Sequence, residues 1–225
     1  MIIQESGIWM NSFFSEDDIY INFNDFKSKK RNFILITGLS GSGKSTLGKE
    51  LAKKYKAEYV ELDAFNFGLV KRNPAEKEVM DRIKSRHLAV YTYIQRFHKK
   101  DPDWMYKYFN NKKIPLYDRK TFAENEGNKF IDWLINDYKK RCVIEGVFIA
   151  TYISQNNKTR FYPIIFKGTS KYTSMFRMMK RNGMLNFDSI LDTLGCADVI
   201  KTFYDDSELA QNHARHTIMN NNYIA

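Results

Sequence analysis

The sequence predicts an α/β fold in which a parallel sheet lies between layers of helices, a three-layer α/β/α arrangement. Residues 33–37 form a continuous run of apolar β-formers, which is typical of a parallel strand buried on both faces. A glycine-rich segment follows, and Leu47, Leu51 and Tyr55 then recur at the spacing of one helix face. Strand, glycine loop, helix and second strand is the order in which a parallel α/β fold begins.

The remaining elements continue this alternation less clearly. Further strands are expected at residues 59–62, 142–145 and 161–166, and helices at about 131–138, at 170–182 and within 187–225. The stretch between residues 69 and 128 is charged and mainly helical, with breaks at Pro74, Pro102 and Pro115. A fifth strand is not evident, and the alternating residues 19–23 are the candidate for it.

These patterns divide the chain into a core and one insert. We expect the core at residues 32–68 and 129–225, with a short lid helix at about 169–184, and an N-terminal extension at 1–31. The insert at 69–128 is basic: from Leu69 to Lys120 there are 14 Lys and Arg against 6 Asp and Glu, a local net charge of +8 within a total of +10. Charge concentrated in one segment indicates an anionic partner, although a solvated lysine-rich surface would give the same count.

Composition narrows the class of protein further. With 43% apolar and 15% aromatic residues, the chain has the material for an ordinary globular core. Cys142 and Cys196 form no CxxC pair, which indicates a reducing compartment rather than a disulfide framework. The first residues lack a signal-peptide pattern, and no uninterrupted apolar run reaches about 18 residues. We therefore expect a cytoplasmic protein that makes no use of a membrane.

The glycine-rich segment after the first strand carries a phosphate-binding motif. It satisfies the pattern GxxxxGK[ST] with the residues Gly38, Leu39, Ser40, Gly41, Ser42, Gly43, Lys44, Ser45 and Thr46. Small residues let backbone N–H groups wrap around phosphate oxygens, and the loop opens a helix whose N-terminus favours an anion. Lys44 is expected at the β- and γ-phosphates, Ser45 at Mg²⁺ and Thr46 at the α-phosphate. The sequence thus predicts a P-loop NTPase fold that binds ATP and Mg²⁺.

Two missing motifs narrow the reaction. ATPases of the motor type generally end an apolar strand with an Asp-Glu pair, whereas this chain has only Glu145-Gly146 after its third strand. The Asn-Lys-x-Asp motif of guanine-nucleotide switches does not occur in the sequence. Small kinases are the large class that remains, and they need an acceptor subdomain and a lid that excludes water.

Three segments together resemble the P-loop kinase superfamily of small nucleoside, nucleotide and metabolite kinases. They are residues 38–46, Leu62-Asp63-Ala64-Phe65 and Ile144-Glu145-Gly146. The Glu-Gly pair looks like uridine kinases, and Leu-Asp-Ala-Phe looks like adenylate-kinase-related proteins. The resemblance implies that Asp63 orients or deprotonates the acceptor, and that Glu145 acts at Mg²⁺ directly or through water. The other interpretations are a helix cap or turn for Asp63 and a buried structural role for Glu145.

The same resemblance implies a lid. Arg177 and Arg181 are four residues apart, so both guanidinium groups project from one face of the expected helix. In related kinases, lid arginines close over the phosphates and stabilise the negative charge of the transition state. An ordinary charged surface helix is the alternative.

The basic insert occupies the place where such kinases bind their acceptor. Arg82, Arg86 and Arg96 are candidates for clamping an acceptor phosphate. The insert is also rich in aromatic residues, which we interpret mainly as the core of this subdomain and otherwise as platforms for a base: Tyr91, Tyr93, Phe97, Trp104, Tyr106, Tyr108, Phe109 and Tyr117.

Three functions follow from the sequence. The first is an ATP-dependent kinase that phosphorylates a hydroxyl or phosphate group of a small acceptor, such as a nucleoside, nucleotide or metabolite. The second is a kinase acting on nucleic-acid ends or modified bases, which the +8 segment favours. The third is a protein that uses nucleotide binding as a switch or interaction signal without transferring phosphate.

Overall fold

The computed structural model describes residues 18–169 together with Thr173 and Arg177. The chain divides into two compact units, which are described separately. Unit 1 holds the described residues up to Tyr59 and from Val143 onward, and unit 2 is Val60–Cys142. The 69–128 segment expected as the insert falls within unit 2.

A five-stranded sheet with the order β1-β5-β2-β4-β3 confirms the predicted α/β class. The strands are β1 Ile19–Ile21, β2 Phe33–Gly38, β3 Glu58–Glu61, β4 Cys142–Glu145 and β5 Ile164–Lys167. β2 and β5 pair in parallel, with Ile36 opposite Ile165 and Gly38 opposite Lys167. β2 is buried along its whole length, as its continuous apolar run predicts.

The fifth strand is β1, from the alternating segment 19–23. β1 pairs with β5 in the antiparallel direction, with Tyr20 opposite Ile165, so the expectation of a wholly parallel sheet needs correcting at this edge. An antiparallel edge strand is a common addition to a parallel sheet. Within the expected 1–31 extension, β1 and helix α2 (Phe23–Lys27) place Tyr20, Phe23 and Phe26 in the core.

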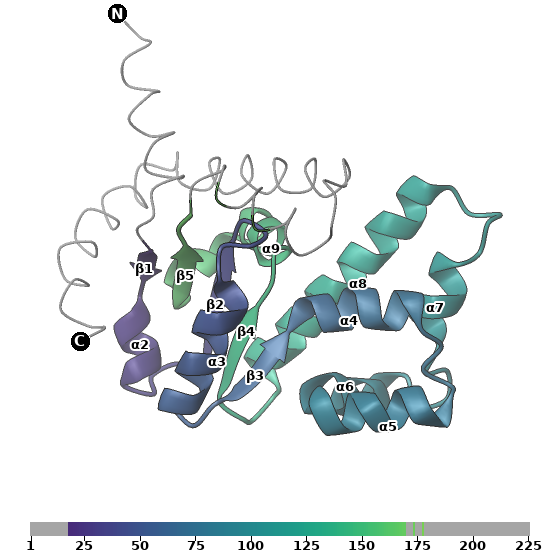
Figure 1. The fold of residues 1–225 in the computed structure, drawn as a ribbon, viewed down its shortest axis with the longest axis horizontal. Coiled ribbons are helices and arrows are strands. Elements are labelled where there is room, and N and C mark those ends of the chain that lie inside the picture. Colours follow the sequence, from purple (N-terminus) through teal and green to yellow (C-terminus); the bar gives the residue numbers. More distant parts are fainter. Residues whose placement is uncertain (1–17, 170–172, 174–176, 178–225) are drawn as a thin grey trace, which may run out of the picture. The chain divides into compact units, whose positions relative to one another are not determined.

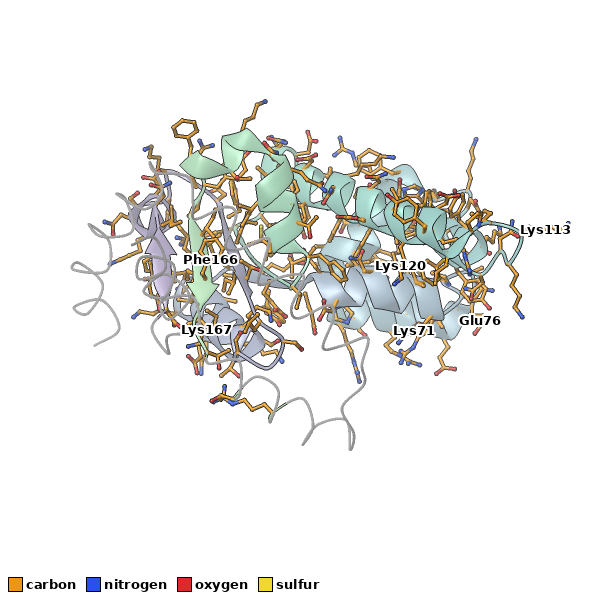
Figure 2. The ribbon with its side chains drawn as sticks, turned by 90° about the horizontal axis from the view of Figure 1, so that it is seen from above. Lys71, Glu76, Lys113, Lys120, Phe166 and Lys167 are labelled. Atoms are coloured by element: carbon orange, nitrogen blue, oxygen red, sulfur yellow. The ribbon has the colours of Figure 1, made fainter. Side chains whose placement is uncertain are left out.

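Helices cover both faces of the sheet in unit 1. On one face, side chains from α2 and from α3 (Lys44–Lys54) join alternate strand residues in one cluster, which includes Ile34, Ile36, Val143 and Ile165. The short helix α9 (Ile149–Gln155) packs against β2 with Ile149 and Ile153 buried. α9 lies on the side of the strands opposite to α3 (Figures 1 and 2), which gives the expected three layers.

Two of the differences from the predicted strand boundaries are caused by the element next to the strand. β3 ends at Glu61 rather than at residue 62, because helix α4 (Leu62–Lys71) begins directly after it. β5 begins at Ile164 rather than at 161, since residues 157–161 form the 3-10 helix η1. The side chain of Asn156 accepts a hydrogen bond from Lys158 N–H and so caps this turn.

Unit 2 is helical, as the charged stretch between residues 69 and 128 predicts. After α4 it contains α5 Lys77–Arg86, α6 Leu88–Phe97, α7 Trp104–Phe109 and α8 Leu116–Asn136. Pro74, Pro102 and Pro115 all lie between helices, and Pro115 directly precedes the first residue of α8 without a side-chain hydrogen bond to it. α8 is much longer than the predicted helix near 131–138, because it continues unbroken from Pro115.

An aromatic cluster holds unit 2 together. Phe65 of α4 stacks on Phe130 of α8 with ring centroids 4.4 Å apart, and Tyr93 of α6 contacts both rings edge-on. Of the eight aromatic residues predicted to form the core of the insert, Tyr93 is buried, Phe97 and Tyr117 are exposed, and the other five are half-buried. The prediction that these residues form the core of the subdomain is therefore confirmed for Tyr93 and wrong for Tyr117, which is 78% exposed.

Candidate nucleotide-binding site

Gly38 ends β2 at a point where no other residue fits. Its φ is +145°, and a Cβ on it would lie 2.5 Å from the backbone oxygen of Lys167 on β5. L-residues rarely adopt this conformation, and the contact is with backbone that cannot move aside cheaply. The first glycine of the motif therefore lets the loop leave the sheet beside β5.

The next two glycines turn the loop into α3. Gly41 and Gly43 have φ of +78° and +94°, both in the left-handed region. The Gly43 carbonyl accepts from the N–H groups of Thr46 and Leu47, each at 3.1 Å, so helix α3 begins at Lys44. Unpaired N–H groups at such a helix start carry partial positive charge, which favours a phosphate.

The Lys44 ammonium lies against the loop itself. Its Nζ donates to the Leu39 carbonyl at 2.9 Å, and the residue is 6% exposed. An ammonium that donates to a neutral carbonyl gains a partner of opposite charge when a phosphate oxygen takes the place of that carbonyl. Lys44 is therefore positioned to exchange this carbonyl for a phosphate.

Ser42 supplies an independent sign of a polar ligand. Its Oγ is buried and has no hydrogen-bond partner among the residues that the structure describes. A buried hydroxyl without a partner costs free energy, on the order of 1–3 kcal/mol. A phosphate group in the loop would provide an acceptor for it.

Ser45 and Glu145 meet beside the loop. The Ser45 hydroxyl lies 3.1 Å from Glu145 Oε1, and Glu145 is 2% exposed at the end of β4. Gly146 N–H donates to the Ile36 carbonyl at 3.1 Å, which holds the end of β4 against β2. Because β4 is the neighbour of β2 in the sheet, two residues 100 positions apart share one site.

Tyr59 is a site residue that the sequence analysis missed. Its hydroxyl donates to Glu145 Oε1 at 2.7 Å, and so contacts the same oxygen as Ser45. Gly48 of α3 makes room for the ring, because a Cβ there would lie 2.8 Å from Tyr59 Cε2. Tyr59 reads in sequence as an ordinary strand aromatic, and its partner lies 86 residues away, so no local pattern marks it.

Of the two arginines expected in a lid, Arg177 contacts the loop. Its Nη1 donates to the Gly41 carbonyl at 3.1 Å, and its side chain is exposed. Arg181 and most of the expected lid at 169–184 lie outside the described residues. The structure thus brings Arg177, Lys44 and Ser45 to one loop.

The acceptor candidates belong to unit 2. Asp63 lies in the first turn of α4 rather than at the end of a strand. The partial positive charge at the start of a helix stabilises a carboxylate in this position. Arg82 pairs with Glu78 at 2.9 Å, and Arg96 lies over the Phe97 ring at 5.4 Å. The contacts described for Arg82, Arg86 and Arg96 do not join these three side chains.

These residues fit a Mg²⁺–nucleotide complex. Mg²⁺ takes oxygen ligands and keeps several waters, so a serine hydroxyl and one carboxylate beside a phosphate loop suit it. The described residues contain no group of three or more His, Cys, Asp or Glu that could hold a metal by themselves. Ser45 and Glu145, whose side chains lie 3.1 Å apart, would hold the ion together with phosphate oxygens and water. None of the described helices is both long and apolar enough to cross a membrane.

The fold and the loop define an α/β protein in which a glycine-rich loop with the GxxxxGK[ST] pattern follows a buried strand. No protein-family model matches the chain, and no curated protein matches it in sequence. Among the solved structures that it resembles is shikimate kinase from Acinetobacter baumannii in complex with shikimate, with a TM-score of 0.35 and 12% identity. The match covers 86% of this chain and 95% of that chain. A TM-score this low carries no conclusion about activity.

Proposed function

We propose that this protein is an ATP- and Mg²⁺-dependent kinase that transfers the γ-phosphoryl group to a hydroxyl or phosphate of a small acceptor. The observation that carries the proposal is the contact between Ser45 Oγ and Glu145 Oε1 at 3.1 Å, next to the loop of residues 38–46. A hydroxyl on the loop and a buried carboxylate on the neighbouring strand form the oxygen pair that a Mg²⁺–triphosphate needs.

The loop residues account for donor binding and charge stabilisation. When bound, Mg²⁺ would neutralise charge on the β- and γ-phosphates. Lys44 would leave the Leu39 carbonyl for a phosphate oxygen, and Ser42 Oγ would gain an acceptor. Arg177 would exchange the Gly41 carbonyl for the transferred group, where a guanidinium stabilises spread negative charge. Positioning and electrostatics of this kind supply most of the catalysis in phosphoryl transfer.

The acceptor side of the proposal rests on unit 2. Asp63 is proposed to orient or deprotonate the acceptor hydroxyl, and Arg82, Arg86 and Arg96 to attract an acceptor phosphate. The concentration of positive charge from Leu69 to Lys120 supports an anionic acceptor. An acceptor without charge would need only the carboxylate.

An acceptor screen tests the proposal directly. Purified full-length protein is mixed with labelled ATP, Mg²⁺ and a panel of nucleosides, nucleotides, sugars and metabolite alcohols, and products are read by mass. We expect one acceptor class to gain a phosphate, and Lys44→Ala to abolish that product while the variant keeps its fold by circular dichroism. Hydrolysis of ATP with no acceptor phosphorylated, across the whole panel, would favour the nucleotide switch instead.

The role of Asp63 needs its own variant. Asp63→Asn keeps the size and polarity of the side chain but removes its capacity to accept a proton, so kcat for the identified acceptor should fall by about 100-fold or more. The dissociation constant for ATP should stay unchanged. Undiminished kcat in this variant would overturn the assignment of Asp63 as the base.

A kinase acting on nucleic-acid ends is the second candidate, because of the same +8 segment. Its affinity for oligonucleotides should fall steeply as salt rises, with a slope set by the number of phosphates contacted. Small acceptors in the screen would then be phosphorylated less well than 5′- or 3′-ended oligonucleotides. Oligonucleotide binding that is absent at low salt excludes this candidate.

A further inference from the structure

A second lysine lies beside the phosphate loop. Lys167 is the last residue of β5, at the carboxyl end of the strand (Figure 2), and pairs with Gly38 in the sheet register. Its side chain runs toward the loop: a Cβ on Gly43 would lie 3.7 Å from Lys167 Cε. The Gly38 contact and the Gly43 contact thus place this lysine against both ends of the glycine segment.

The Lys167 ammonium forms an ion pair with the carboxylate of Asp18, the first residue that the structure describes. Its Nζ lies 2.8 Å from Asp18 Oδ1 and 3.0 Å from Oδ2, and the Gly168 N–H donates to the same Oδ1 at 3.1 Å. The exposed fractions of the two side chains are 25% for Lys167 and 13% for Asp18. The ion pair is therefore less screened by water than a fully exposed pair, while part of the Lys167 side chain stays accessible to a ligand.

A nucleotide changes the balance at this pair. A triphosphate brings several negative charges to a loop that Lys167 already touches, and charges in a partly buried site interact more strongly than in water. A lysine ammonium on a flexible stem can turn from one anion to another without moving the backbone. Asp18 would at the same time repel the incoming phosphates, so it opposes binding as long as it stays charged nearby.

We propose that Lys167 is a second phosphate-binding lysine of the loop, and that Asp18 competes with the nucleotide for it. The inference rests on the proposed function, because it needs a phosphate ligand in the loop of residues 38–46. It adds to that function a residue outside the GxxxxGK[ST] motif and a carboxylate that sets the affinity. Free protein keeps the Lys167–Asp18 pair, and bound protein exchanges it for a Lys167–phosphate pair.

A purely structural pair is the competing explanation. In that case the ion pair only fastens the segment before β1 to the end of β5, and loss of either partner should weaken the fold and nucleotide binding alike. Competition predicts opposite signs: loss of Lys167 weakens binding, whereas loss of the Asp18 charge strengthens it. The sign of the Asp18 effect therefore separates the two explanations.

The experiment is isothermal titration of the full-length protein with Mg²⁺–ATP, pyrophosphate and adenosine. Lys167→Met should weaken Mg²⁺–ATP and pyrophosphate about 10-fold or more, since one charge-assisted contact is lost. Asp18→Asn keeps an oxygen that can accept from Gly168 N–H, and should tighten both ligands about 3-fold or more. Adenosine carries no phosphate, so its affinity should change in neither variant. Lys167→Arg keeps the charge and should bind close to wild type.

Failure of this inference is distinct from failure of the proposed function. If wild type binds Mg²⁺–ATP and Lys44→Ala abolishes binding, but Asp18→Asn binds equally or more weakly, the competition is excluded and the loop assignment stands. If wild type binds neither Mg²⁺–ATP nor pyrophosphate, the proposed function falls and takes this inference with it. Should Lys167→Met fail to fold, the Asp18→Asn and Lys167→Arg variants still decide the question.

Discussion

The hydroxyl of Tyr59 lies 2.7 Å from Glu145 Oε1, and this contact fixes a buried carboxylate beside the phosphate loop. Ser45 donates to the same oxygen at 3.1 Å. If Ser45 turns toward a Mg²⁺ ion, Tyr59 still holds the carboxylate in place. Residues that orient a metal ligand in this way commonly change metal affinity without touching the metal.

Tyr59→Phe should therefore weaken Mg²⁺ binding as well as the fold. The variant keeps the ring and removes one hydrogen bond to a carboxylate, which costs about 1.5–3 kcal/mol of unfolding free energy. The Mg²⁺ concentration for half-maximal ATP binding should rise by roughly 10-fold or more. The fluorescence of a labelled ATP analogue, followed while Mg²⁺ is titrated into the protein, measures this concentration. Tyr117→Phe is the matched control at an exposed position and should leave the titration unchanged.

Gly48→Ala should destabilise the protein, against the usual effect of alanine in a helix. Alanine normally stabilises a helix interior over glycine by about 1 kcal/mol. Here the new Cβ would meet Tyr59 Cε2 at 2.8 Å, and a shift of that ring strains its bond to Glu145. We expect a net loss of about 1–3 kcal/mol in urea denaturation. Tyr59→Ala in the same chain removes the clash, so adding Gly48→Ala to that variant should no longer destabilise it.

Gly38→Ala should be the most damaging glycine substitution in the loop. The added Cβ meets backbone oxygen at 2.5 Å, and φ of +145° strains any L-residue. A loss of about 3 kcal/mol or more in unfolding free energy is expected, with nucleotide binding lost as well. Gly68→Ala in α4 is the control, because a Cβ there meets nothing within 4 Å. That control should be neutral or stabilise by up to about 1 kcal/mol, and a similar loss in both variants would contradict the steric argument.

His98 makes the stability of the protein depend on pH. Its ring stacks on that of Trp104 with the ring centroids 3.6 Å apart. Burial lowers the pKa of the imidazole below its ordinary value of 6.5, and the positive charge of Lys129 lowers it further. The negative charges of Glu126 and Asp101 raise the pKa, but by less than burial lowers it. Between the lowered pKa and 6.5 the unfolded chain binds more protons than the folded one. The contribution of neutral, buried His98 to the free energy of unfolding is therefore fully present above pH 6.5, and it declines as the pH falls from 6.5 toward the lowered pKa.

The variant His98→Phe keeps an aromatic ring against Trp104 and removes the titrating group. The fall in unfolding free energy between about pH 7.5 and about pH 5.5 should be smaller in this variant than in wild type. Some pH dependence should remain, because burial and Arg86 also lower the pKa of His87. An unchanged difference between the two pH values would show that His98 titrates alike in the folded and unfolded chain.

Prediction from sequence succeeded where neighbours in the chain are neighbours in space. β4 occupies residues 142–145 as predicted, since an apolar run of β-formers bounded by polar residues is a local signal. It was less accurate at β5, where the turn η1 replaces the first predicted strand residues. The direction of β1 could not be predicted, because the alternating pattern marks a strand but does not identify its partner.

The sequence by itself determined the phosphate loop and its place between a buried strand and a helix, because backbone conformation, glycine spacing and the lysine all lie within nine consecutive residues. Only the tertiary structure decided what surrounds that loop. Ser45, Tyr59 and Glu145 come from three separate elements, and Lys167 meets a carboxylate 149 positions away. The order of strands brings these side chains together, and strand order follows from packing of the whole sheet rather than from any local pattern.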